Sequence, residues 1–216
     1  PRVRKLLDTY VDAEEVLEIT SGINIFNKNE VAEALESYGK TEASKADYIA
    51  NTMKKVINEN MEKDEAFYKK FSDLIEETIR DFHEGRLSEK EYLETILDTR
   101  DNLEQGHQDG IPSIIKDKPT ARAFFGAVTE VLKGAHGEEK ITSVSETLAN
   151  AGLGIAEIVD QLTIRDWKKN LDVQRQMENE IEDYLIEHRK HLGIEITFDE
   201  IDEILSKCLK VAKHNF

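Results

Sequence analysis

Several residue types that organise other classes of protein are scarce in this chain. Its 216 residues include one cysteine, three prolines, eleven glycines and one tryptophan. A single cysteine excludes the disulfide framework that small secreted domains rely on. Few prolines and glycines disfavour a β-sandwich or barrel, because those folds need many tight turns. The composition therefore favours long helices.

Long hydrophobic runs are also missing. No stretch of about eighteen apolar residues occurs, and no basic-then-apolar signal segment opens the chain. We therefore expect no membrane contact and a cytoplasmic location. The sequence starts at Pro1 without a methionine, from which we expect it to be part of a longer protein.

Negative charge dominates what is present. Forty-five acidic residues against twenty-nine basic ones give a formal net charge of −16. This charge repels phosphate groups at long range, so a free-standing DNA-binding protein is disfavoured. The 39% of hydrophobic residues is nevertheless enough to build a core, which disfavours a disordered chain.

Apolar residues recur at steps of three and four, the pattern of amphipathic helices. The clearest stripes lie within residues 46–61, 67–82, 92–103, 124–132, 142–162, 173–188 and 201–209, and shorter ones lie within 6–11 and 31–35. We predict an all-α fold, an irregular multi-helix bundle of about seven or eight helices. Two of these helices, antiparallel and joined near Gly85, should share a core made of Phe71, Leu74, Ile75, Tyr92 and Leu93.

Local signals divide the chain further. Ser88 with Glu91, and Thr197 with Glu200, have the spacing of capping boxes that begin helices. The segment 106–119 contains two glycines and two prolines, at positions 106, 110, 112 and 119, so it should be the longest irregular connection. We place a boundary near Gly39, with residues 1–40 ending a preceding helical domain and residues 41–216 forming a C-terminal helical domain.

The usual patterns of catalytic and metal sites are incomplete. Gly152-Leu153-Gly154 lacks a third glycine and a preceding strand, so helix flexibility or close helix packing explains it better than nucleotide binding. His188 and His191 have no sulfur ligands nearby in the sequence. The triplet at 138–140, Glu-Glu-Lys, should lie in a loop beside Gly137, whereas a nuclease site needs further carboxylates fixed on a rigid frame. We predict no catalytic, cofactor or metal-binding residue, and we expect Cys208 to be a small buried hydrophobe.

One segment, residues 163–175, departs from the acidic background. Four basic residues against two acidic ones give it a local charge of +2, and it holds the only tryptophan. Such a segment can contact phosphates at close range. A tryptophan that fills the core beneath solvated charges is the alternative. The candidate DNA- or partner-binding residues are Arg165, Trp167, Lys168, Lys169, Asn170 and Arg175.

Two longer blocks resemble a known family. The first reads DEAFYKKFSDLIEETI at residues 64–79 and continues as RLSEKEYL at 86–93. The second reads WKKNLDVQRQM at residues 167–177 and continues as EIEDYL at 180–185. Both resemble the C-terminal region of the motor (R) subunit of type I restriction-modification enzymes, and the resemblance extends over roughly residues 41–216.

The resemblance implies a parent that is an ATP-dependent type I site-specific endodeoxyribonuclease. Its endonuclease domain and two helicase-like ATPase domains, which use ATP and magnesium, match nothing in this chain. The fragment is therefore expected to be no enzyme and to hold no cofactor. Its implied role is to help the motor dock on the methyltransferase core and bind DNA. The implied partners are the methyltransferase and specificity subunits, double-stranded DNA and other domains of the same subunit.

A second interpretation remains open. The two blocks would then be helix-packing signatures of a purely structural protein-interaction module, with all DNA contacts made by the motor domains. Binding of DNA over a series of salt concentrations discriminates between these interpretations.

Overall fold

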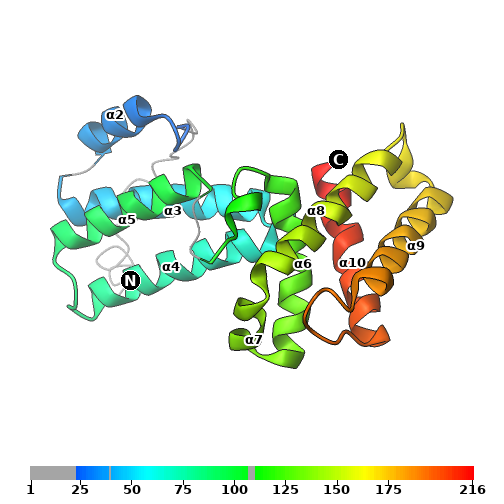
Figure 1. Cartoon of the computed structure of the whole chain (residues 1–216). Helices are drawn as coiled ribbons and strands as arrows, with labels where there is room; N and C mark the ends of the chain where they lie inside the picture. Colours follow the sequence, from blue (N-terminus) through cyan, green and yellow to red (C-terminus); the bar gives the residue numbers. More distant parts are fainter. Residues whose placement is uncertain (1–22, 39, 107–109) are drawn as a thin grey trace, which may run out of the picture.

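The computed structural model describes residues 23–38, 40–106 and 110–216, and within these residues it contains helices and no strand. This confirms the all-α prediction. The helix predicted within residues 6–11 lies outside the described residues. Two groups of helices stand side by side (Figure 1). The first lobe, residues 23–106, contains α2 (Lys28–Tyr38), α3 (Glu42–Asn60), α4 (Glu65–His83) and α5 (Glu89–Glu104).

The second lobe, residues 110–216, contains five α-helices and two short 3-10 helices. They are η1 (Ser113–Ile115), α6 (Pro119–His136), α7 (Glu138–Ser143), α8 (Ser145–Leu162), η2 (Trp167–Lys169), α9 (Leu171–His188) and α10 (Phe198–Asn215). None of the helices in the described ranges is both long and apolar enough to cross a membrane.

The first lobe closes around the apolar faces of α3, α4 and α5. The buried residues of α3 lie on one helix face, as steps of three and four residues require, and are Ala46, Ile49, Ala50, Met53 and Ile57. Tyr92 of α5 is fully buried, its ring stacks on Phe82 of α4 with centroids 4.5 Å apart, and its hydroxyl donates to Asp47 of α3. The helix α2 adds Val31 to the same cluster.

One predicted core residue of this lobe is exposed. Phe71 and Ile75 are buried as predicted, whereas the side chain of Leu74 is 39% exposed. The inward face of α4 runs through Phe67, Phe71, Ile75 and Thr78. Leu74 comes one residue before Ile75, which turns it about 100° away from that face on a helix with 3.6 residues per turn. The prediction that Leu74 lies in the core is therefore wrong.

The core of the second lobe centres on the contact between α6 and α8. A Cβ atom added to Gly152 of α8 would lie 2.7 Å from the carbonyl oxygen of Ala121 and 2.9 Å from the backbone nitrogen of Phe125. Glycine thus lets two helix backbones approach each other, which supports close packing, one of the two explanations offered for the Gly152-Leu153-Gly154 stretch. An extended segment between α9 and α10 adds the buried residues Ile194 and Ile196 to this core.

Helix ends follow the local signals, with two exceptions. Both predicted capping boxes are present, at Ser88 with Glu91 and at Thr197 with Glu200. The triplet at 138–140 does not form a loop, because it begins α7. Glu138 and Glu139 suit the first turn of a helix, where the backbone dipole is positive. A non-helical Val144 then separates α7 from α8, so the helix predicted to begin near Thr142 begins at Ser145.

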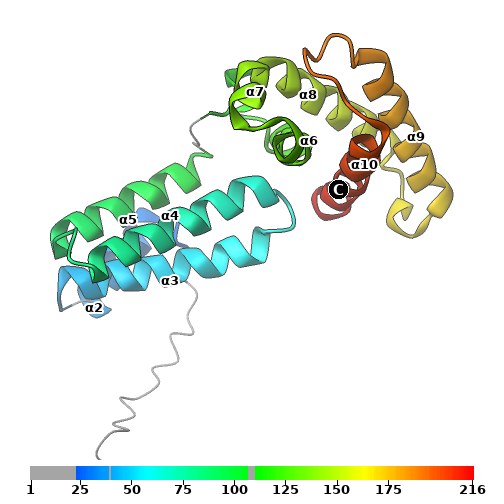
Figure 2. The ribbon, with the colours of Figure 1, turned by 90° about the horizontal axis from the view of Figure 1, so that it is seen from below.

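The start of α4 meets α6 at the joint between the two lobes (Figure 2), and a buried ion pair links the two helices there. The Nε atom of Arg122 donates to Oδ2 of Asp64 at 2.8 Å, and both side chains are more than 90% buried. The other carboxylate oxygen of Asp64 caps α4 by accepting from the backbone N–H of Phe67. The Arg122 guanidinium lies 3.8 Å above the Phe67 ring, a cation–π contact. Lys210 of α10 adds an exposed ion pair to Glu65.

Candidate interaction surface

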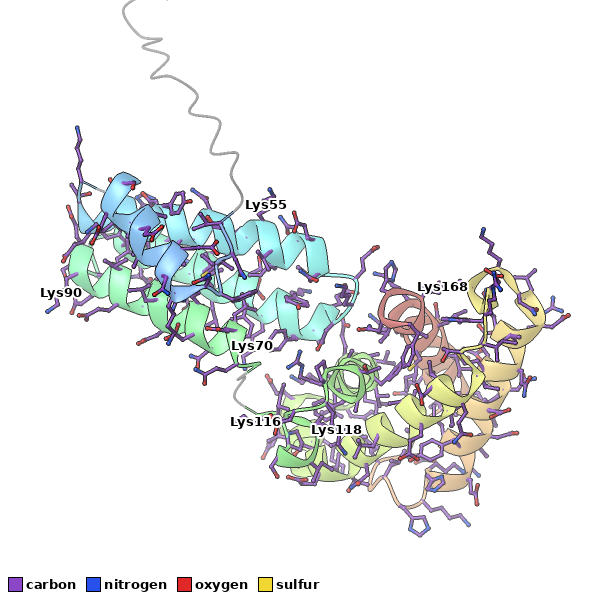
Figure 3. The ribbon with its side chains drawn as sticks, turned by 90° about the horizontal axis from the view of Figure 1, so that it is seen from above. Lys55, Lys70, Lys90, Lys116, Lys118 and Lys168 are labelled. Atoms are coloured by element: carbon purple, nitrogen blue, oxygen red, sulfur yellow. The ribbon has the colours of Figure 1, made fainter. Side chains whose placement is uncertain are left out.

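The basic segment predicted from the sequence forms the connection between α8 and α9, here named the corner (residues 163–175). Figure 3 labels Lys168 there, at the end of the second lobe that is remote from the first lobe. The corner contains the 3-10 helix η2 and the first residues of α9. Trp167 is buried within the apolar core of the second lobe, so the corner is anchored through its tryptophan.

Polar contacts hold the backbone of the corner in one conformation. The Nε2 atom of buried Gln174 donates to the carbonyl oxygen of Lys168 at 2.7 Å and approaches that of Trp167 at 3.5 Å. The side-chain oxygen of Asn170 caps α9 by accepting from the N–H groups of Asp172 and Val173. Asp166 has a φ of 62°, the one non-glycine residue in the described part of the chain with a positive φ.

The predicted site residues fall into three groups. Arg165, Lys169, Asn170 and Arg175 lie around one shallow hollow of about 590 Å³, together with Asp166, Leu171 and Asp172. Lys168 is exposed outside this hollow, and Trp167 is buried in the core of the second lobe. The structure therefore brings four of the six predicted residues together.

The charges of the hollow are mostly available to a partner. Arg165 is almost fully exposed and lies 3.7 Å from Asp166, while Lys169 and Arg175 have no ion-pair partner among the described residues. Three basic and two acidic side chains line the hollow, so its local charge is +1. It is a locally positive surface on a strongly negative chain.

Two exposed apolar side chains belong to the corner and were not foreseen as surface residues. Leu171, the first residue of α9, is 65% exposed and lines the hollow, and Ile164 is 57% exposed just before Arg165. Helical periodicity could not identify them, because one lies at a helix terminus and the other lies outside a helix. The sequence signal for their exposure was that each of them lies next to a charged residue.

The other candidate groups have structural explanations. Gly154 faces the ring of Tyr184, whose atoms lie 2.4 Å from where a Cβ would be, so this glycine permits contact between α8 and α9. The Nδ1 atom of His188 lies 2.8 Å from the backbone carbonyl oxygen of Tyr184, and the His188 ring stacks on the Tyr184 ring. No group of three potential metal-binding side chains occurs in the ranges that the structure describes.

The lone cysteine is a core residue, as predicted. Cys208 is fully buried on α10, and burial raises the pKa of its thiol to about 12. The thiol is therefore protonated and unreactive near neutral pH in the folded protein.

Comparison with known proteins assigns the chain to a family. A family model described as Type I restriction enzyme HindI endonuclease subunit-like, C-terminal, matches residues 1–214. Neither the curated proteins nor the solved structures gave a match. The family match spans both lobes, the joint between them and the corner. The chain therefore belongs to the family of C-terminal regions of HindI-like type I restriction enzyme endonuclease subunits.

Proposed function

We propose that this chain is the non-catalytic assembly domain of a type I restriction enzyme motor subunit. It docks the motor on the methyltransferase core and so helps the complex to hold DNA. The ATP- and magnesium-dependent steps belong to other domains of the same subunit. The observation that carries the proposal is the corner, which presents basic side chains on a backbone anchored by buried Trp167.

Electrostatics supports a contact that forms only at short range. The net charge of −16 opposes the approach of this chain to DNA on its own. Screening limits such repulsion to about 8–10 Å at physiological salt, so a local positive surface can contact DNA phosphates once other domains have brought the DNA near it. An accessory domain inside a larger complex fits both features.

The test removes three of the four basic side chains of the corner in the full-length subunit. The variant Lys168→Ala/Lys169→Ala/Arg175→Ala should weaken association with the methyltransferase and specificity subunits, and restriction in cells should fall. Its melting temperature should stay near that of the parent, because exposed charges contribute only about 0–1 kcal/mol to folding.

A charge-matched control excludes a general effect of lost positive charge. Lys55, Lys90 and Lys116 are exposed on other surfaces (Figure 3), and their triple replacement by alanine should leave association unchanged. Direct DNA binding by the corner would appear as a flatter salt dependence, by about one unit of slope for each lost phosphate contact. Parent-level association, DNA affinity and restriction in the corner variant would refute the proposal.

A further inference from the structure

The corner combines its basic side chains with exposed apolar ones. Three large apolar side chains in the described ranges are more than half exposed, and two of them, Ile164 and Leu171, belong to the corner. Leu171 lines the same hollow as Arg165, Lys169 and Arg175. Ile164 does not line the hollow but directly precedes Arg165 in the chain, and exposed apolar groups with polar neighbours are typical of interaction sites.

We infer that the corner is a protein interface and that its partner surface is acidic with an apolar recess. This inference rests on the proposed function. Leu171 and Ile164 enter the recess, while Arg165, Lys169 and Arg175 pair with carboxylates around it. This arrangement has the apolar centre and charged rim that protein interfaces share.

The chemistry of the corner fits a protein better than DNA. The contacts that proteins make with phosphate and sugar are mostly polar, so a DNA backbone gives Leu171 and Ile164 little apolar surface to bury against. The positive charge around the hollow is only +1, on a chain of −16. A DNA surface of that charge would be weakly held, because affinity for DNA rises with the number of phosphates neutralised. An acidic protein surface needs only a few paired charges.

The corner is also rigid enough to serve as an anchor. Buried Trp167 fixes it to the core, and Gln174 and Asn170 use their side chains to bind its backbone. A surface held in its binding conformation loses less conformational entropy on association. Leu171 thus presents its side chain from the first turn of a helix whose start is capped.

The test separates the apolar from the basic side chains in the full-length endonuclease subunit. The variant Ile164→Ser/Leu171→Ser is titrated against the assembled methyltransferase and specificity subunits, and separately against DNA over a salt series. Association with the subunits should weaken on the order of tenfold, as for residues that anchor an interface. DNA affinity of the endonuclease subunit alone should stay within twofold of the parent at each salt concentration.

Phe198 offers a matched control. Like Leu171 it is 65% exposed and is the first residue of a helix of the second lobe. Phe198→Ser should leave association with the other subunits unchanged, and melting curves should show all variants folded, since exposed positions tolerate substitution.

Each other outcome decides against the inference. Unchanged association of the Ile164/Leu171 variant would overturn it, as would an equal loss in the Phe198 control. Reduced DNA affinity with intact association would identify nucleic acid as the partner. If the triple basic variant loses association while the apolar variant does not, the proposed function stands and the inference alone fails. If neither variant changes anything, both fail.

Discussion

At the scale of single residues, the buried ion pair between Asp64 and Arg122 should be sensitive to the loss of either partner. Burial raises the pKa of the Asp64 carboxyl, and this effect outweighs the lowering by the Arg122 charge and hydrogen bond. Desolvation thus cancels much of the attraction between the two groups, so the intact pair adds little net stability. Removing one partner is different, because it leaves the other as a lone buried charge.

Asp64→Asn should therefore destabilise the protein strongly. Asparagine caps helices as well as aspartate does, so the start of α4 keeps its cap. Its amide nitrogen, however, replaces the oxygen that accepts from Arg122. We expect a loss of about 3–5 kcal/mol in the free energy of unfolding, measured by chemical denaturation. The control Lys210→Met removes an exposed ion pair between the same two lobes and should cost less than about 1 kcal/mol. Equal effects of both changes would contradict this account.

Phe71 and Leu74 give a second residue-scale prediction within one helix. Phe71→Ala empties a fully packed position and should cost about 3–5 kcal/mol. Leu74→Ala removes a side chain that is partly in solvent and should cost less than about 1.5 kcal/mol. Thermal melts of both variants test the orientation of α4. A Leu74 variant as unstable as the Phe71 variant would mean that a different face of α4 packs in the core.

At the scale of elements, glycines decide how closely α6 and α8 pack. Gly152→Ala would push a methyl group into the backbone of α6, which cannot move aside as a flexible side chain can. We expect a loss of about 1–3 kcal/mol, as for overpacked cores. Gly134→Ala, within α6, meets nothing within 4 Å and should stabilise the protein by about 0.4–1 kcal/mol. Denaturation midpoints that shift in the same direction for both variants would contradict the close approach.

Elements were predictable from the sequence where the signal was local. Capping pairs such as Ser88 with Glu91 identify helix starts, because the hydrogen bonds lie within a single turn. The orientation of Leu74 was not predictable, since neighbouring apolar residues widen the stripe and only packing against α3 and α5 selects the buried face. The burial of Gln174 was also unpredictable, because its partners are carbonyl groups placed by the turn itself.

At the scale of the whole molecule, the joint should make the two lobes unfold together. Cys208 lies in the core of the second lobe, where burial raises its thiol pKa to about 12. Because the thiol is both buried and protonated, thiol reagents should react with it only after the second lobe has opened. Circular dichroism reports the helices of both lobes. In the parent protein we expect helix loss and Cys208 labelling to have the same denaturation midpoint. In the Asp64→Asn variant the two midpoints should differ. Two transitions in the parent protein would show that the lobes unfold independently.

The division of the chain into two lobes could not be predicted from the sequence. The amphipathic stripes predict that a core exists but not how it divides, because pairing of faces depends on distant residues. Asp64 and Arg122 are 58 positions apart, and neither has a sequence pattern that marks it as buried. The candidate site was recognisable from its local charge and single tryptophan, whereas the clustering of Arg165, Lys169 and Arg175 around a hollow depends on the fold. The boundary placed near Gly39 stays a prediction.

Binding of this 216-residue chain to the purified methyltransferase and specificity subunits, in the absence of other motor domains, tests the assembly role most directly. Sedimentation at micromolar concentration would measure it, with circular dichroism confirming that the chain is helical. The account predicts saturable binding that the Lys168→Ala/Lys169→Ala/Arg175→Ala variant weakens and the Lys55→Ala/Lys90→Ala/Lys116→Ala variant does not. A folded chain that shows no binding to these subunits would contradict it.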